Sequence, residues 1–65
     1  MKRSELLRHL SDNGCEVLRE GKRHTHVTNP KNGAISSVPR HNDLKRETAR
    51  SVCKDLGIPL PRSLG

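Results

Sequence analysis

The sequence predicts a small α+β domain in which one helix, three antiparallel strands and a second helix follow one another, an α-β-β-β-α order. Three observations support this prediction. Apolar residues recur at helical spacing near both ends, β-branched residues are frequent between them, and turn-forming Gly, Asn and Pro separate the strand-like runs. We expect both helices on one face of the sheet, because the opposite face of a small antiparallel sheet can stay in water.

The first helix is predicted to begin at Ser4, whose side chain suits an N-cap, and to bury a leucine-rich side that runs to Leu10. Gly14 ends this helix, because glycine tolerates left-handed backbone angles. The first strand then covers residues 15–19, and the turn into the second strand lies at 20–21. The pattern therefore predicts a hairpin directly after the first helix.

The second and third strands are predicted at residues 24–28 and 34–38. The turn between them, at 29–33, contains a proline that presets its own φ and an Asn-Gly pair that accepts positive φ. Pro39 ends the third strand, because proline has no N–H to give to a ladder. The three strands should form an antiparallel meander.

The second helix has the clearest periodic signal in the chain. Gly57 is the expected left-handed C-cap, and Pro59 prevents the helix from continuing. We therefore expect one domain over residues 1–58 and a C-terminal tail over 59–65. Four apolar residues at positions i, i+3, i+4 and i+7 line its buried side: Ala49, Val52, Cys53 and Leu56.

The core must be small, because the chain has 65 residues, of which 29% are hydrophobic and none is aromatic. An enclosed pocket for a small molecule is not expected, and neither is a cofactor. Cys15 and Cys53 are far apart and form no Cys-x-x-Cys motif, so they are interpreted as small core residues.

The charge balance indicates a polyanionic partner, because 13 Lys and Arg stand against 7 Asp and Glu, a net charge of +6. Without aromatic side chains to stack on bases, contacts to RNA should go to phosphates and sugars. No stretch suits a membrane surface, a membrane span or a signal region, so we expect a cytoplasmic protein. The candidate RNA-binding residues are Lys22, Arg23, Arg40, His41, Lys45, Arg46 and Arg50.

His24 is the candidate catalytic residue. Side chains alternate along a strand, so if Val27 faces the core, His24 and His26 face solvent. An exposed imidazole beside Lys22 and Arg23 can transfer a proton at neutral pH, while the cations stabilise phosphate charge. The same residues also suit a plain basic surface, so the pattern alone leaves catalysis open.

A metal site is the alternative use of these histidines. His24 and His26 could supply two ligands from one strand, with His41 as a third, but the surrounding cations oppose a metal ion. We therefore expect no metal. His9, on the first helix, is expected to have no special role.

Several short motifs follow one another along the chain: Ser4-Glu5-Leu6-Leu7, Gly14, the turn at 21–24, Asn29-Pro30, Val38-Pro39-Arg40-His41, and Thr48-Ala49-Arg50 through Leu56-Gly57-Ile58. In their order and spacing, over nearly all of residues 1–58, the chain resembles the HicA-type toxins of bacterial toxin–antitoxin systems.

This resemblance implies a double-stranded-RNA-binding-like fold, ribosome-independent cleavage of mRNA, and inhibition by a HicB-type antitoxin. Family members carry a catalytic histidine after a glycine at the start of the second strand, and His24 matches it by its distance from Pro30. The resemblance thus implies an endoribonuclease toxin with His24 as general acid or base. Two other classes stay open: a non-catalytic RNA-binding module of the same fold, and a protein–protein adaptor with an incidental basic surface.

Overall fold

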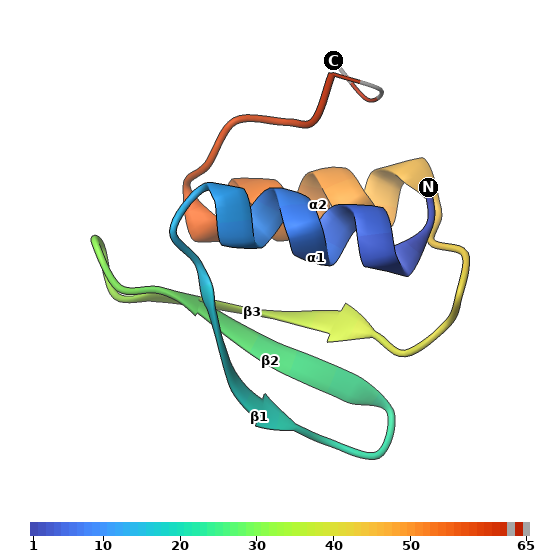
Figure 1. Cartoon of the computed structure of the whole chain (residues 1–65), viewed down its shortest axis with the longest axis horizontal. Coiled ribbons are helices and arrows are strands. Elements are labelled where there is room, and N and C mark those ends of the chain that lie inside the picture. The colour runs from blue at the N-terminus through green and yellow to red at the C-terminus, as the bar shows by residue number, and fades with distance from the viewer. Residues whose placement is uncertain (63, 65) are drawn as a thin grey trace.

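The structure is a computed structural model, and it describes residues 1–62 and residue 64. Its element order is the predicted one (Figure 1). The strands form one antiparallel sheet in the order β1-β2-β3. The elements are α1 (Arg3–Asp12), β1 (Glu16–Glu20), β2 (His24–Asn29), β3 (Ala34–Pro39) and α2 (Arg46–Leu56).

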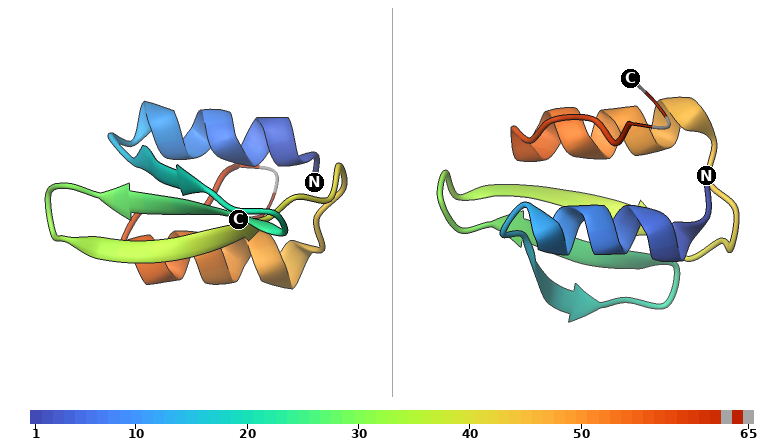
Figure 2. Two further views of the ribbon diagram at one scale, coloured as in Figure 1. Left: turned by 90° about the horizontal axis from the view of Figure 1, so that it is seen from below. Right: turned by 45° about the horizontal axis from the view of Figure 1, so that its top comes forward.

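Both helices lie on one face of the sheet, as predicted (Figures 1 and 2). Helix α2 packs along β3. The core fills the space between helices and sheet, and it is built from aliphatic side chains and the two cysteines, which are free and buried. Its members include Leu6 and Leu10 of α1, Val27 and Val38 of the sheet, and Ala49, Val52, Cys53 and Leu56 of α2.

The register of the sheet confirms the predicted orientation of the second strand. Strands β2 and β3 pair without interruption from His24 opposite Pro39 to Asn29 opposite Ala34. Thr25 is fully buried, whereas His24 is exposed. The pairing of β1 with β2 has an irregularity after Val17. The outer face of the sheet therefore carries His24, and the inner face carries the core.

The predicted C-cap of α2 is confirmed in detail. Gly57 has φ 69°, in the left-handed region. Its N–H donates to the Lys54 carbonyl at 3.1 Å, and the Ile58 N–H donates to the Cys53 carbonyl at 3.1 Å. These two bonds make a Schellman motif, which satisfies carbonyls at the end of the helix.

The start of α1 differs from the prediction. Lys2, not Ser4, is the N-cap residue, and Ser4 lies inside the first turn. The backbone N–H of Arg3 donates to the Asn42 carbonyl at 2.8 Å, and Lys2 pairs with Asp43 in an isolated antiparallel bridge. A loop far along the chain thus satisfies a terminal N–H of the helix, so no hydroxyl cap is needed.

The segment after α2 runs back over the helices on the side away from the sheet (Figure 1). Pro61 and Leu64 are buried, and Leu60 packs against the core. His9, for which no role was expected, has a structural one: its Nε2 lies 2.7 Å from the Pro59 carbonyl oxygen and must donate to it. Within the described residues, no helix has the length and apolar character needed to span a membrane.

Candidate functional site

A hollow of about 480 Å³ lies where the β1–β2 hairpin meets the segment that follows β3. Among the described residues that line it there are three cations and two histidines, and no carboxylate. The lining residues are Lys22, Arg23, His24, Pro39, Arg40 and His41. The structure thus brings His24 together with Lys22, Arg23, Arg40 and His41, as a site for a phosphate group requires.

The sheet register explains why residues so far apart in sequence meet. His24, the first residue of β2, pairs with Pro39, the last residue of β3, so Arg40 and His41 leave the sheet beside it. The Arg40 N–H donates to the Arg23 carbonyl at 3.1 Å, which extends the ladder by one bond beyond the strands. The backbone therefore fixes both sides of the hollow.

Gly21 closes the hairpin against His24. Its N–H donates to the His24 carbonyl at 2.8 Å. A Cβ at this position would lie 2.9 Å from the same carbonyl oxygen, closer than real Cβ atoms approach such an atom. Glycine is therefore needed here for the close approach of the backbone, and this close approach sets the path of the chain into His24.

The imidazole of His24 is exposed and, within the described part of the chain, makes no hydrogen bond to another side chain or carbonyl. Such a ring can accept or donate a proton without first breaking a bond inside the protein. It lines the hollow together with the three cations. An imidazole in this position can transfer a proton to or from a phosphate ester that binds beside it.

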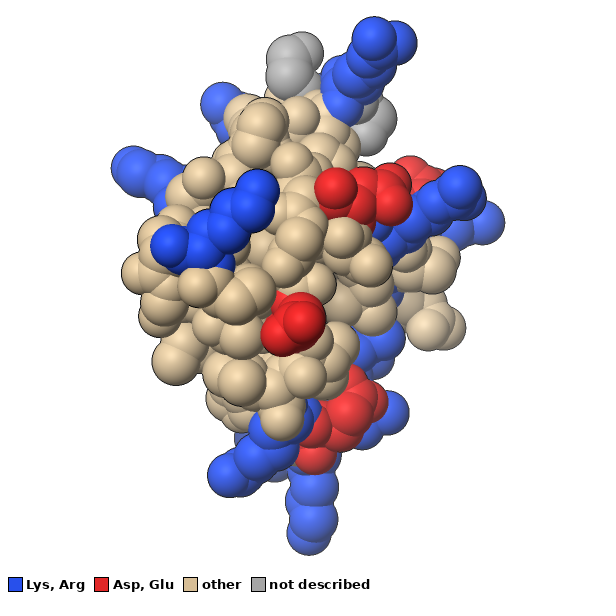
Figure 3. Space-filling view, turned by 60° about the vertical axis from the view of Figure 1, so that its left-hand side comes forward, with Lys and Arg blue, Asp and Glu red and all other residues tan. Residues whose placement is uncertain are grey.

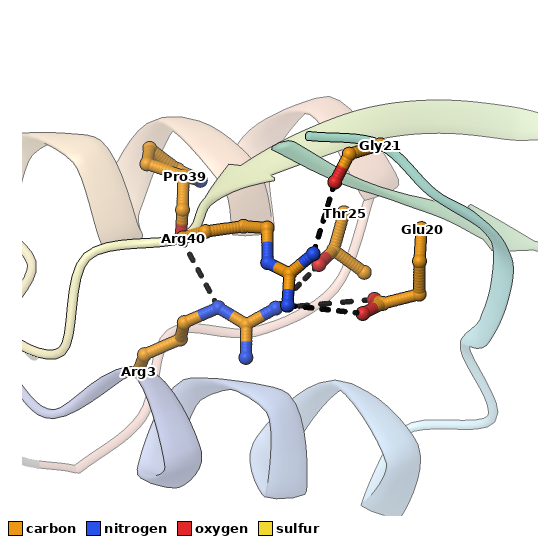
Figure 4. Close-up of polar contacts among 6 residues, drawn as sticks. All are labelled: Arg3, Glu20, Gly21, Thr25, Pro39 and Arg40. Atoms are coloured by element: carbon orange, nitrogen blue, oxygen red, sulfur yellow. Dashed lines mark hydrogen bonds and ion pairs between the residues drawn. The ribbon is translucent and has the colours of Figure 1, made fainter. Parts of the chain in front are cut away.

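The guanidinium groups of Arg3 and Arg40 contact the residues at this end of the sheet (Figure 4). Nη1 of Arg40 donates to the Gly21 carbonyl at 3.1 Å, and its Nη2 lies 3.9 Å from a carboxylate oxygen of Glu20. The other oxygen of that carboxylate lies 4.0 Å from Nη2 of Arg3. Arg40 is therefore anchored to the protein while its side chain stays about half exposed.

The sequence did not point to Arg3 or Glu20. Nε of Arg3 donates to the Pro39 carbonyl at 3.2 Å, and its Nη2 donates to the Thr25 hydroxyl. The first of these partners is 36 residues away and the second is 22. Contacts of this range leave no local pattern, and an arginine near the start of a helix reads as an ordinary surface cation.

The other candidate cations lie elsewhere. Lys45 is the N-cap residue of α2, Arg46 opens the helix, and both are exposed. Arg50 is also exposed and lines a separate hollow with Lys54. On the side of the molecule at the left of Figure 1, Lys and Arg side chains project mainly from the rim, with acidic groups among them (Figure 3). The basic residues are therefore spread over the surface.

A larger groove, of about 580 Å³, lies between β3 and α2 and also includes His24. Its described lining contains His26, the carboxylates of Glu47 and Asp55, and no Lys or Arg. Ser36 donates to Asp55 at 3.0 Å across this groove. His24 thus stands between a cationic hollow and a groove with acidic groups.

The three-histidine metal site considered from the sequence does not form within residues 1–62 and 64. No group of three or more His, Cys, Asp or Glu among them is arranged so that it could hold a metal ion. His41 lines the hollow beside Arg40, whereas His26 lines the groove along β3. The two histidines flank His24 on different sides.

The fold and this cluster are those of a small basic domain with two exposed histidines, His24 and His41, at a cationic hollow. A model of a protein family, described as the HicA toxin of bacterial toxin–antitoxin systems, matches residues 3–58. The chain therefore belongs to the HicA toxin family, whose members act as toxins that are paired with an antitoxin. Neither the comparison with curated proteins nor that with solved structures found a match.

Proposed function

We propose that this chain is an endoribonuclease toxin that cleaves mRNA without the ribosome, with His24 as its general acid or base. The observation that carries the proposal is the position of His24, exposed at a hollow whose described lining holds Lys22, Arg23 and Arg40 and no carboxylate. A phosphate in that hollow would lie among three cations and the imidazole of His24.

Cleavage of RNA requires two things of the protein: the transfer of protons and the stabilisation of charge on the phosphate. The 2′-oxygen of a ribose loses its proton and forms a bond to the adjacent phosphorus, and the bond from phosphorus to the 5′-oxygen breaks as that oxygen takes a proton. His24 handles one of these protons, and His41, in the same hollow, is the second candidate. Lys22, Arg23 and Arg40 offset the negative charge on the phosphoryl oxygens.

Each chemical step can be written with this chain's own residues, so we propose that cleavage needs no metal ion. Binding should go to phosphates and sugars, because the chain has no Phe, Tyr or Trp on which bases could stack. Affinity should therefore fall steeply with salt, and sequence selectivity should be low.

The antitoxin of the pair, which we propose to be of the HicB type, has to cover the cationic hollow. A partner that offers Asp and Glu to Lys22 and Arg23 would block RNA by charge and by bulk, and would cover His24 at the same time. Mapping of histidine modification in the complex tests this idea. A bound antitoxin that leaves His24 as reactive as in the free toxin contradicts it.

The deciding experiment expresses the chain under tight control in a bacterium and follows growth and the integrity of total mRNA. We expect growth arrest with loss of mRNA for the parent, and neither effect for His24→Ala. His26→Ala is the matched control, because His26 lies on the same strand and face but outside the cationic hollow. It should remain toxic.

Other outcomes point to other classes. Equal toxicity of the parent and His24→Ala would mean that another residue carries the chemistry. No toxicity from a folded parent would favour a non-catalytic RNA-binding module, which uses the same cations to grip duplex RNA by its shape. In that case RNA binding persists in His24→Ala and no cleavage is seen in either protein.

A further inference from the structure

We propose that Arg3 is a positioning residue for the reaction at His24. This inference rests on the proposed function and adds to it a residue that lies outside the cationic hollow. Arg3 is the first residue of α1, and its side chain is 22% exposed. It touches the backbone and side chains that frame His24, and it does so from the helix side of the sheet.

A single guanidinium joins the ends of all three strands. Arg3 contacts Glu20 at the end of β1, the Thr25 hydroxyl at the start of β2, and the Pro39 carbonyl at the end of β3 (Figure 4). The first, at 4.0 Å, is an ion pair, and the others are hydrogen bonds, the one to Pro39 at 3.2 Å. Two of these strand ends contribute lining residues to the hollow, His24 from β2 and Pro39 from β3.

Two of the contacted residues are immediate neighbours of His24. Thr25 follows it along β2, and Pro39 pairs with it across the sheet. Thr25 is fully buried and points to the inner face, whereas His24 points outward. Arg3 therefore holds the side chain of the residue that follows His24 in β2 and the carbonyl of the residue opposite His24 in β3. It does so from the face of the sheet opposite to the imidazole.

Glu20 extends the same network to a residue of the hollow itself. Its carboxylate lies between the guanidinium groups of Arg3 and Arg40, at 4.0 and 3.9 Å. Arg40 also holds the Gly21 carbonyl, and the Gly21 N–H holds the His24 carbonyl. A continuous path of contacts thus runs from Arg3 to the hairpin turn and to the segment that bears Arg40.

This role requires arginine. A guanidinium presents several donors in a rigid plane, and here it serves three acceptors in different directions. A lysine keeps the charge and most of the stem, but its ammonium is a compact group that cannot reach all three. Misplacement of a catalytic group by about 1 Å can cost on the order of 100-fold in rate.

The test compares Arg3→Lys with Arg8→Lys. Arg8 lies on the exposed side of the same helix, so the control makes the same chemical change away from the strand ends. With purified proteins and an RNA oligonucleotide, we expect kcat of Arg3→Lys to fall roughly 10- to 100-fold while KM changes less than about 3-fold. Arg8→Lys should behave as the parent does.

Amide hydrogen exchange provides a readout that does not depend on cleavage. The N–H groups of Gly21 and Arg40 donate to the carbonyls of His24 and Arg23, respectively. These two hydrogen bonds fix the backbone on either side of His24, which we call the frame around His24. In Arg3→Lys we expect faster exchange at these two amides and unchanged exchange in α2. A general loss of stability would instead speed up exchange throughout the chain.

The outcomes separate this proposal from the proposed function. If the parent cleaves RNA and Arg3→Lys keeps its kcat, or if exchange speeds up uniformly, Arg3 is not a positioning residue. If the parent does not cleave RNA, the proposed function fails. The exchange at Gly21 and Arg40 then still decides whether Arg3 holds the frame around His24.

Discussion

The two ends of the sheet are tied to the rest of the molecule by different chemistry (Figure 1). At the end that carries the 29–33 turn, neutral side-chain amides bond the sheet to the end of α2. Nδ2 of Asn29 and Nδ2 of Asn32 both donate to the Leu56 carbonyl, at 2.9 and 3.1 Å. At the other end, the guanidinium groups of Arg3 and Arg40 share the carboxylate of Glu20.

The difference in chemistry corresponds to a difference in role. Asn29 is 4% exposed, and its amide is one of two donors to a carbonyl at the end of α2, so its loss removes a buried hydrogen bond that only the exposed Asn32 then replaces in part. The ion pairs at the other end are partly in water, where such pairs contribute about 0–1 kcal/mol. The neutral end mainly stabilises the fold, whereas the charged end surrounds His24.

The largest effect on stability is expected from Asn29→Ala. It removes the bond to Leu56 and also the bond from the Lys31 N–H to Oδ1 of Asn29. We expect a loss of about 1–3 kcal/mol in the free energy of unfolding, measured by urea denaturation. Asn32→Ala, at an exposed position of the same turn, should cost less. Equal losses would mean that burial of Asn29 does not matter.

The next largest losses of stability are expected from alanine substitutions at two glycines, Gly33 in this turn and Gly57 at the end of α2. Gly33 has φ 73°, so an alanine there costs about 1–2 kcal/mol from backbone strain, although a Cβ would meet no atom within 4 Å. Gly57 has φ 69°, and a Cβ there would lie 2.8 Å from Nδ2 of Asn32. Gly57→Ala should therefore destabilise more than Gly33→Ala. Thermal unfolding of the two variants checks the order, and the reverse order contradicts this account of the turn.

Replacing one lysine at each end of the sheet tests whether RNA binds at the charged end. Lys22→Ala should weaken RNA binding several-fold and reduce the slope of log affinity against log salt by about 1, because one phosphate contact is lost. Lys31→Ala removes an exposed cation from the neutral end and should change neither quantity. Salt titrations of binding distinguish the two. If both lysines contribute equally, RNA does not select the charged end.

The smallest effect is expected from the two buried cysteines of the core, which make the stability of the fold depend on pH. Burial raises the pKa of the Cys15 thiol, and burial together with the nearby Cys15 raises the pKa of the Cys53 thiol. The folded protein then keeps these protons to higher pH than the unfolded chain does. The contribution to stability is full below the unfolded pKa of about 8.5 and is lost as pH rises above it.

Unfolding measured between pH 7 and 10 checks this sign. The Cys15→Ala/Cys53→Ala double variant is the control: it should be less stable at neutral pH, and its stability should decline less steeply above pH 8.5. A parent whose stability rises over this range would show that the thiols are not protected by burial.

Much of the fold could be predicted from the sequence because its signals are local. The left-handed cap at Gly57 and the spacing from Ala49 to Leu56 each act within a few residues, and the structure confirms both. The turn at 29–33 also forms, but of its Asn-Gly pair only Gly33 has the expected positive φ. The alternation along β2 likewise gave the outward direction of His24. Local chemistry was sufficient for these features.

The rest depends on contacts between distant parts of the chain. The prediction of Ser4 as N-cap was wrong because the loop at 42–44 pairs with the first residues and supplies the missing acceptor. The roles of Arg3 and Glu20 depend on strand ends that only the folded sheet brings together. The gathering of Arg40 and His41 beside His24 follows from the register, which the sequence left to be determined.

The most direct test of the division between the two ends measures stability and RNA cleavage together for His24→Ala and Asn29→Ala. We expect His24→Ala to lose roughly 100-fold or more of its cleavage rate and to keep its stability within about 0.5 kcal/mol, because its side chain is exposed. Asn29→Ala should lose stability and, well below its melting temperature, cleave RNA as the parent does. If His24→Ala still cleaves RNA, or if Asn29→Ala is inactive while folded, the two ends do not have the separate roles described.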